Sequence, residues 1–361
     1  MLERAYLRVQ HLRHLTDRNG LLRGGGFREP DGFSGYSTLD NGLALRVATR
    51  LNDLGLHDDA SDWALIYLRF LFQACRVGRG FSAGRDALGH WSEETLSAAE
   101  HAQVARGLAA ASAGTLPGVA IGRADALWAK VLPTFSNIAC PRAAANWLIA
   151  IAERPRSEWR NYEEVADRLA GLLLDERLNA HRADDWMWFD SHLCSGDGCL
   201  PHGLWAAYSL LGQPRLARAA ERATQFFAEQ LFVDGVYTPV GTSQGWARHR
   251  PRPLFDQVPA DVAATVELFT YAARVTGDGE YAGRAAAAHA WFTGANVLGI
   301  HMLDDTTGGV YDALSEDGHA PGQGATAIVS FLLSATALRS LETGRTSQCA
   351  MATTSGSATR S

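Results

Sequence analysis

The stretch LPHGLWAAYSLLGQPRLARAAERATQFFAEQL, residues 200–231, contains two helical patterns with almost no loop between them. Apolar residues recur at helical spacing from Leu200 to Leu211 and again from Pro214 to Leu231. The two patterns are joined only by the connection LGQ. Because helices joined by so short a loop are antiparallel neighbours, the stretch predicts a helical hairpin.

The same periodicity continues outward in both directions and predicts about twelve helices. Before the hairpin they cover 2–16, begin at 40, 58 and 92, and cover 119–132, 141–151 and 161–178. After it they begin at 259 and 280, and the last covers 325–338. No series of strand patterns competes with this interpretation, so the sequence predicts an all-α fold.

The connections alternate between long and short, and this alternation predicts the architecture. Odd-numbered helices are followed by long loops such as HRADDWMWFDSHLCSGDGC and LGIHMLDDTTGGVYDALSEDGHAPGQ. Even-numbered helices are followed by short ones such as DLGLH, ERPRSEW and TGDG. Because every second connection is long, all the long loops should lie at one end of the molecule. We therefore predict an (α/α)6 toroid, a six-hairpin barrel, over 1–342; an open α-solenoid is the alternative, with similar loops throughout.

The remaining composition excludes several classes of protein. Apolar residues are 47% and charged residues 20% of the chain, and the net charge is −6, so nucleic-acid binding is not expected. No signal peptide is evident, and no apolar run approaches the roughly 20 residues of a membrane span, so we expect a cytoplasmic protein. The five cysteines are odd in number and irregularly spaced, and no cofactor motif is present. Residues 343–361 are small and polar and predict a disordered tail.

The long loops lead into the even-numbered, inner helices, whose first turns should converge on one cavity. Helix N-termini favour anions and hydroxyl acceptors. The loops are rich in aromatic, acidic and amide side chains. Flat aromatic faces surrounded by acids and amides suit sugars, and two carboxylates across a cleft provide a general acid and a general base. The sequence therefore predicts a sugar or glycoside ligand.

The candidate residues fall into three groups. Asp256 and Asp197 are the predicted acid/base pair, with Asp40 assisting. The predicted aromatic platform consists of Tyr36, Trp91, Trp188 and Trp246. The predicted hydroxyl-binding and other substrate-binding residues are Asn41, Gln257, Asp312, Gln323, Glu94, His202, Arg250 and Tyr311.

Each group also has a plain structural interpretation. Asp40 and Asp256 could cap the helices that follow them. Asp197 could be a turn residue, and Glu94 could interact favourably with a helix dipole. One of Trp186 and Trp188 could belong to the core. The basic stretch from Arg248 to Arg252 is either a solvated loop or an anion site. The soft-ligand set His192, Cys194, Cys199 and His202 has awkward spacing for zinc, so packed thiols are favoured and no metal is expected.

Several motifs, taken together, resemble a known group of proteins. They are residues 35–43 (GYSTLDNGL), 188–190 (WFD), 195–198 (SGDG), 255–259 (FDQVP), 291–296 (WFTGAN), 308–314 (GGVYDAL) and 322–326 (GQGAT). The chain thereby resembles the six-hairpin glycosidase-like proteins, and more narrowly a bacterial helical domain often fused behind glycosyltransferases. The resemblance covers nearly the whole chain. It implies an (α/α)6 fold, a sugar ligand and a possible glycosyltransferase partner.

At three places that family carries acidic residues where this chain does not. Leu39 replaces the Asp before Asp40, Leu96-Ser97-Ala98-Ala99 replaces Gly-Ser-Glu-Asp, and Thr326 replaces the closing Glu. Our leading hypothesis is an enzyme that cleaves a glycosidic bond, as a hydrolase or phosphorylase, with paired carboxylates. One alternative is a repurposed toroid enzyme (isomerase, lyase or cyclase) of small-molecule biosynthesis. The other is a non-catalytic carbohydrate-binding partner of a glycosyltransferase.

Overall fold

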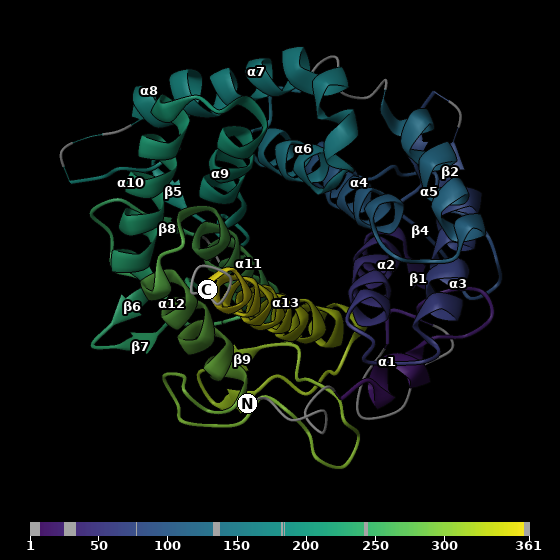
Figure 1. Ribbon diagram of the computed structural model, residues 1–361. Helices are drawn as coiled ribbons and strands as arrows, with labels where there is room; N and C mark the ends of the chain where they lie inside the picture. The colour runs from purple at the N-terminus through teal and green to yellow at the C-terminus, as the bar shows by residue number, and fades with distance from the viewer. Residues whose placement is uncertain are drawn as a thin grey trace.

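The helices of this protein form two concentric rings, as a computed structural model shows (Figure 1). The structure describes residues 8–24, 34–76, 78–132, 138–181, 183, 185–241 and 245–356, with only the backbone over 345–356. The inner ring consists of α2 (Thr38–Asp53), α4 (Ala98–Ala113), α6 (Pro141–Glu153), α9 (Cys199–Leu211), α11 (Pro259–Thr276) and α13 (Ala325–Gly356). Each inner helix packs against the next, and α13 packs against α2. This closure confirms the predicted toroid, because the two ends of an open solenoid would not meet.

The outer ring covers the inner one. Its members are α1 (Gln10–Leu15), α3 (Ala60–Ala74), α5 (Gly118–Val131), α7 (Glu163–Gly171), α8 (Asn179–His181), α10 (Pro214–Leu231) and α12 (Gly279–His289). A 3₁₀ helix, η3 (Arg156–Tyr162), precedes α7, a π-helical segment, η4 (Leu172–Leu178), joins α7 to α8, and a 3₁₀ turn, η5 (Ala290–Phe292), ends α12. The predicted helix over 161–178 is therefore built from three successive kinds of helical turn.

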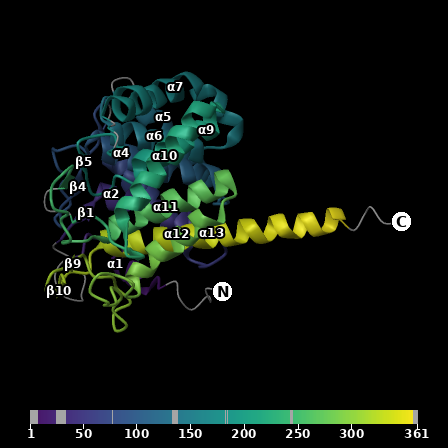
Figure 2. The ribbon, with the colours of Figure 1, turned by 90° about the vertical axis from the view of Figure 1, so that its left-hand side faces the viewer.

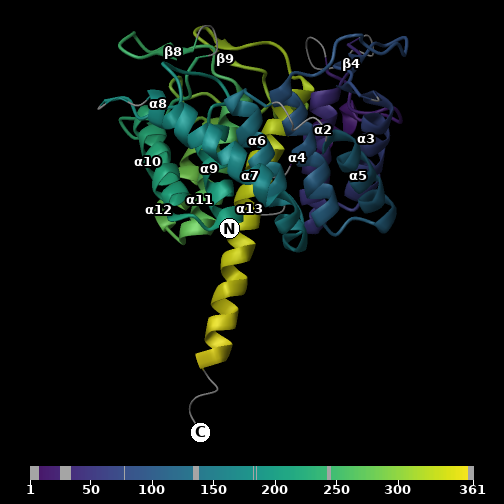
Figure 3. The same cartoon turned by 90° about the horizontal axis from the view of Figure 1, so that it is seen from above.

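Short antiparallel ribbons occupy the long loops. They pair β1 (Tyr36–Ser37) with β4 (Gly84–Arg85), β2 (Cys75–Arg76) with β3 (Gly80–Phe81), β5 (His192–Leu193) with β8 (Trp246–Ala247), β6 (Phe232–Val233) with β7 (Val236–Tyr237), and β9 (Leu314–Ser315) with β10 (Gly318–His319). Figure 3 shows β4, β8 and β9 on the same face of the toroid, opposite the end from which α13 projects. The long loops therefore share one face, as the alternation of loop lengths predicts.

Glycines allow adjacent inner helices to approach closely. A Cβ placed on Gly107 of α4 would lie 2.4 Å from the carbonyl oxygen of Gly42 in α2. A Cβ on Gly203 of α9 would lie 2.7 Å from the Cα of Ala145 in α6. No larger residue fits these crossings without moving the backbone, so the ring owes its tight inner circumference to them.

A buried charge network bridges the inner helices. The Glu267 carboxylate of α11 accepts from Arg46 at 2.5 Å, Arg50 at 2.7 Å and Arg106 at 3.1 Å. Glu153 at the end of α6 accepts from Arg46 at 3.4 Å and from Arg106 at 3.3 Å. Burial opposes the ionisation of Glu267, but Arg46 and Arg106 outweigh it and hold its pKa well below the ordinary value. The ring is thus tied together by ions as well as by apolar packing.

Several helix ends differ from the prediction. The fourth helix begins at Ala98, not near Ser92, because Ser97 and Glu100 form a capping box that starts it there. Glu94 therefore lies in the preceding loop, and its predicted role at the helix dipole is wrong. The described part of the first helix is Gln10–Leu15; residues 2–7 of the predicted helix lie outside the described ranges.

The last helix differs most. It continues beyond the predicted end at Leu338 to Gly356 and projects past the rings (Figure 2). The disordered tail over 343–361 stays a prediction. Within the described residues, one helical segment, Ala325–Gly344, is long enough and apolar enough to cross a membrane. Most of this segment is buried in the protein as part of the inner ring.

Candidate functional site

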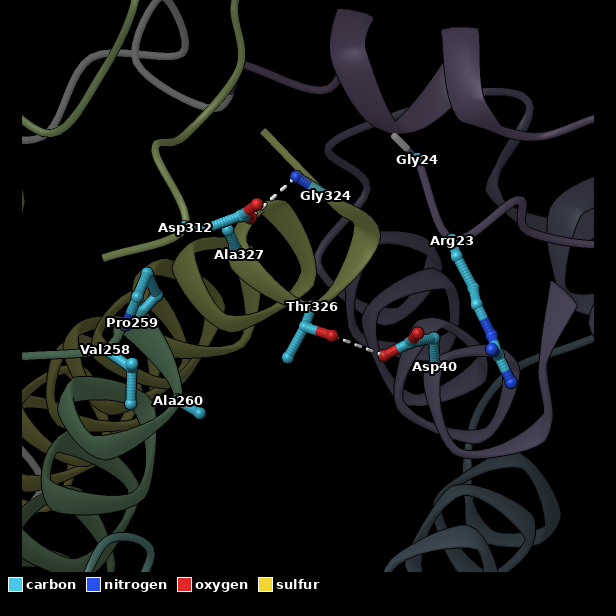
Figure 4. Close-up of a pocket in the computed structure, with 10 residues that line it drawn as sticks. All are labelled: Arg23, Gly24, Asp40, Val258, Pro259, Ala260, Asp312, Gly324, Thr326 and Ala327. Atoms are coloured by element: carbon cyan, nitrogen blue, oxygen red, sulfur yellow. Dashed lines mark hydrogen bonds between the residues drawn. The ribbon is translucent and has the colours of Figure 1, made fainter. Parts of the chain in front are cut away.

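A cavity of about 470 Å³ opens on the loop face at the first turns of three inner helices. It is lined by Arg23, Gly24, Asp40, Val258, Pro259, Ala260, Asp312, Gly324, Thr326 and Ala327 (Figure 4). These residues come from the starts of α2, α11 and α13 and from two of the loops that precede them. The expectation that the inner helices present their first turns to one cavity is met by these three.

Asp40 is the acid of the first turn of α2. Its carboxylate accepts a 2.8 Å hydrogen bond from the Thr326 hydroxyl, and the residue is 6% exposed. Burial raises its pKa, and the hydrogen bond from Thr326 acts in the opposite direction. Ser37, not Asp40, caps the helix, since its Oγ accepts from the Asp40 backbone N–H at 3.2 Å. The capping interpretation of Asp40 is therefore wrong, and its carboxylate faces the cavity.

Asp312 supplies the second carboxylate of the cavity. Its Oδ1 accepts a 2.7 Å hydrogen bond from the backbone N–H of Gly324, just before α13. A Cβ on Gly322 would lie 2.0 Å from Asp312 Oδ2, so only glycine leaves room for the carboxylate. Burial raises the pKa of Asp312, and the charge of Asp312 in turn raises the pKa of Asp40. Both acids of the cavity are thus biased toward holding a proton.

Arg23 is the basic residue that lines the cavity. Its side chain extends beside Asp40 (Figure 4), and its positive charge lowers the pKa of Asp40 against the dominant effect of burial. The site therefore combines two carboxylates, one guanidinium and three helix N-termini. Such a set can donate a proton, accept a proton and bind hydroxyl or anionic groups of a ligand.

The predicted catalytic pair Asp256 and Asp197 does not meet at this cavity. Asp256 is exposed and accepts a 2.5 Å hydrogen bond from Ser315 Oγ, and the residue at the cap of α11 is Val258, not Asp256. Asp197 is buried elsewhere, where it pairs with Arg142 at 2.7 Å and accepts from the Cys194 N–H at 2.8 Å. The geometry therefore favours Asp312, which the sequence placed among the binding residues, as the partner of Asp40.

The amides that were expected to bind hydroxyls hold the protein together instead. Asn41 exchanges hydrogen bonds with the backbone of Leu21, at 2.9 and 3.2 Å. Gln257 accepts from Trp291 Nε1 at 2.7 Å, and Gln323 donates to Asp304 at 2.9 Å. All three side chains are buried. They fix the loops around the cavity and do not line it.

The predicted aromatic platform is divided between core and loop face. Trp188 is 0% exposed and stacks on Phe227 with ring centroids 5.2 Å apart, so its assignment to a sugar platform is wrong. Trp186 is buried as well, so neither tryptophan faces a cleft. Tyr36 is buried with its hydroxyl donating to Asp17 at 2.8 Å. Three further aromatic candidates are half-buried and do not line the cavity: Trp91, Trp246 and Tyr311.

The other binding candidates also lie away from the cavity. Glu94 and Arg250 are exposed, and His202 is buried in α9 against Tyr271. In the basic stretch, Arg248 pairs with Asp185 and Arg252 donates to the carbonyl oxygen of Gln230 at 2.5 Å. These two arginines anchor a loop and are not available as an anion site.

The four soft-ligand side chains weighed for zinc are not gathered together. His192 is exposed on β5, whereas Cys199 and His202 are buried in α9. Across the described parts of the chain, no three His, Cys, Asp or Glu side chains are arranged to hold a metal ion.

Sequence reasoning missed three residues that shape the loop face. Thr326 was noted only as a lost acid, and Arg23 was not considered, although it precedes a run of glycines in a long loop. Asp261, in the first turn of α11, accepts 2.6 Å hydrogen bonds from Ser195 Oγ and the Gly196 N–H. Burial raises the pKa of Asp261 to about 6. The sequence does place Asp261 two residues after Pro259, in the first turn of a predicted inner helix, and this position could have identified it as a candidate.

Comparison with known proteins supports the fold. No known family model matches the chain, and neither does any curated protein. A sugar epimerase from a ruminal bacterium is similar in structure, with a TM-score of 0.68 at 16% identity over 94% of this chain and 99% of the other. A D-mannose isomerase has a TM-score of 0.65 at 10% identity over 93% of this chain and 97% of the other.

A third similar structure is a hydrolase. It is an inactive variant of the GH76 alpha-1,6-mannanase of Salegentibacter sp. HEL1_6 in complex with alpha-1,6-mannotriose. Its TM-score is 0.65 at 12% identity over 94% of this chain and 98% of the other. At such low identity these likenesses establish the fold alone. The chain therefore has the (α/α)6 toroid fold that these proteins share.

Proposed function

We propose that this protein is a carbohydrate-active enzyme whose active site is the cavity at the starts of α2, α11 and α13. Within that class we favour cleavage of a glycosidic bond, with Asp40 and Asp312 as the acid/base pair. The observation that carries the proposal is that both carboxylates line one cavity and that burial raises the pKa of each. A pair of carboxyl groups is the usual equipment for glycosidic cleavage.

The environments of the two acids suggest their roles. Asp40 is the more deeply buried and has its charged form disfavoured by burial and by Asp312, so it is the proton donor to the leaving oxygen. Asp312 is partly open to the cavity and holds one oxygen on the Gly324 N–H, which leaves the other to accept a proton from water. Arg23 would position a hydroxyl or an anionic group of the substrate beside Asp40.

A second candidate function is sugar epimerisation or isomerisation. It is favoured by the structural similarity to a sugar epimerase and a D-mannose isomerase. The same two carboxyl groups could remove and return a proton at a carbon next to a carbonyl group.

The predicted cytoplasmic location and glycosyltransferase partner are also part of the proposal.

The experiment is a turnover screen in deuterated water, followed by NMR. Glycosides, with and without phosphate, and reducing sugars are incubated with the wild type, Asp40→Asn and Asp312→Asn. Cleavage creates a new reducing end, or a sugar phosphate, with no deuterium on carbon. Epimerisation incorporates deuterium on carbon without cleavage. Cleavage that is lost in both variants supports the proposal. Epimerisation, or binding without any turnover, would overturn cleavage in favour of the second candidate or of a binding protein.

A further inference from the structure

A second cavity, of about 480 Å³, lies at the other end of the inner ring. The side chains that matter here are Arg154, Arg156, Trp159, Ser209, Tyr271 and Arg274. They come from the ends of α6, α9 and α11 and from η3. Both cavities contact α11, the first at Ala260 and the second at Arg274. At 1.5 Å of rise per residue these positions are roughly 20 Å apart, so the second cavity is separate from the candidate active site.

The charges around the second cavity do not balance. Glu153 and Glu267 are already paired with Arg46, Arg50 and Arg106 in the buried charge network. Arg154 is paired with Asp125 at 2.7 Å and Glu158 at 2.6 Å. Within the described residues, Arg156 and Arg274 form no ion pair. Both side chains are exposed at the cavity, so their guanidinium groups are open to an anion from solution.

Aromatic rings hold these two cations in place. The guanidinium of Arg156 lies over the Trp159 ring at 5.4 Å, and that of Arg274 lies over the Tyr271 ring at 5.4 Å. The Tyr271 hydroxyl donates to Ser209 Oγ at 3.1 Å, which fixes that ring. Guanidinium groups that are already oriented lose less freedom when they bind an oxyanion.

The helix dipole accounts for only one of these two exposed arginines. Arg274 lies in the last turn of α11, where a cation complements the helix dipole. Arg156 begins η3, so the same account does not apply to it. A shared anionic ligand explains why both face one cavity.

We propose that this cavity binds a small molecule that carries a phosphate group, at a site independent of the proposed active site. Arginine forks match phosphate oxygens in a bidentate manner. The volume is within the range of small-molecule pockets and leaves room for a sugar-sized group beside the phosphate.

The test is titration calorimetry on the full chain with inorganic phosphate, glucose 6-phosphate, glucose and gluconate. We expect saturable binding of the phosphates, weakened at least tenfold in the double variant Arg156→Gln/Arg274→Gln. Glucose 6-phosphate that binds more tightly than inorganic phosphate points to a phosphorylated sugar, and equal affinities point to the free ion; both support the site. Arg79→Gln, which removes an exposed arginine elsewhere, is the matched control and should bind as the wild type does.

Two further variants keep the proposal falsifiable. Arg274→Lys keeps the charge but not the fork, so it should show intermediate affinity even if the double variant folds poorly. Asp312→Asn changes only the proposed active site and should leave phosphate binding intact. No saturable phosphate binding, binding unchanged in Arg274→Lys and the folded double variant, or tighter binding of gluconate than of any phosphate would overturn the proposal.

Discussion

Thr326 donates a 2.8 Å hydrogen bond to the carboxylate of Asp40, and this contact joins the last inner helix to the first. The bond lies at the closure of the ring, so the same contact that completes the toroid also orients an acid of the cavity. The family that the sequence resembles has a glutamate where this chain has Thr326. A neutral hydroxyl at that position leaves Asp40 without a like charge there, and Asp312 remains to raise its pKa.

Arg23→Gln should shift the pH dependence of catalysis. The charge of Arg23 lowers the pKa of Asp40 against the larger effect of burial, so its removal raises that pKa further. If Asp40 donates a proton in the reaction, activity should then persist to higher pH. The measurement is the pH profile of kcat, with Arg23→Lys as the control that keeps the charge. An alkaline limb that stays in place in Arg23→Gln would argue against Asp40 as the proton donor.

Asp261→Asn should reduce the pH dependence of stability. The folded pKa of about 6 lies above the ordinary 3.8, so the folded state binds this proton more tightly than the unfolded state. The resulting stabilisation is fully present below the ordinary pKa and is lost as the pH rises through about 6. The loss amounts to roughly 3 kcal/mol. Urea unfolding of Asp261→Asn at several pH values should show a smaller decline across this window.

The control for Asp261 is Asp256→Asn, which changes an exposed carboxylate. Its decline in unfolding free energy between pH 4 and pH 6, the window of roughly two units that the Asp261 shift defines, should equal that of the wild type. An equal decline in Asp261→Asn would mean that Asp261 is not the group that titrates there.

Glu267→Gln should destabilise the ring strongly. The substitution leaves Arg46, Arg50 and Arg106 facing a neutral amide in a buried network. Removing one partner of a buried ion pair costs about 3–5 kcal/mol. Denaturant unfolding measures this loss, and Glu280→Gln, which removes the surface pair with Arg284, should cost about 0.5 kcal/mol or less. Similar losses in the two variants would show that the buried charge network stabilises the protein no more than a surface ion pair does.

Gly107→Ala should destabilise the protein although alanine is the better helix former. The new methyl group would meet the Gly42 carbonyl oxygen at 2.4 Å and push α4 away from α2. Gly122→Ala is the matched control, because a methyl group on this helical glycine of α5 would have no neighbouring atom within 4 Å. It should gain up to about 1 kcal/mol from helix propensity. Thermal unfolding distinguishes the two, and a gain of stability in both would contradict the close crossing.

Helix periodicity and loop length were enough to predict the ring, because both follow from local sequence. Asp40 and Asp312 were also recognisable, since each lies in a loop or a first turn of the elaborated face. The direction of individual side chains was not predictable. Gln257 forms a bridge with Leu314 and points inward to Trp291, so the neighbouring Asp256 is left exposed. Trp188 was predicted to belong to an aromatic platform, but its ring stacks on Phe227 in the core, a contact that the sequence does not reveal.

The charge networks lay beyond sequence reasoning for a different reason. Arg46, Arg106 and Glu267 come from three inner helices that are far apart in the chain. In the sequence each is one charged residue within an amphipathic pattern. Only the closed ring brings them together, and the same holds for Arg156 and Arg274 at the second cavity.

The most direct test of the central claim is kcat/KM for Asp312→Asn beside Asp256→Asn, on the glycoside that the screen identifies. We expect Asp312→Asn to lose about 10²–10⁴-fold, as removal of an acid/base group does, and Asp256→Asn to keep the activity of the wild type. Full activity in Asp312→Asn together with a large loss in Asp256→Asn would contradict the account and return the site to the loop that carries Asp256.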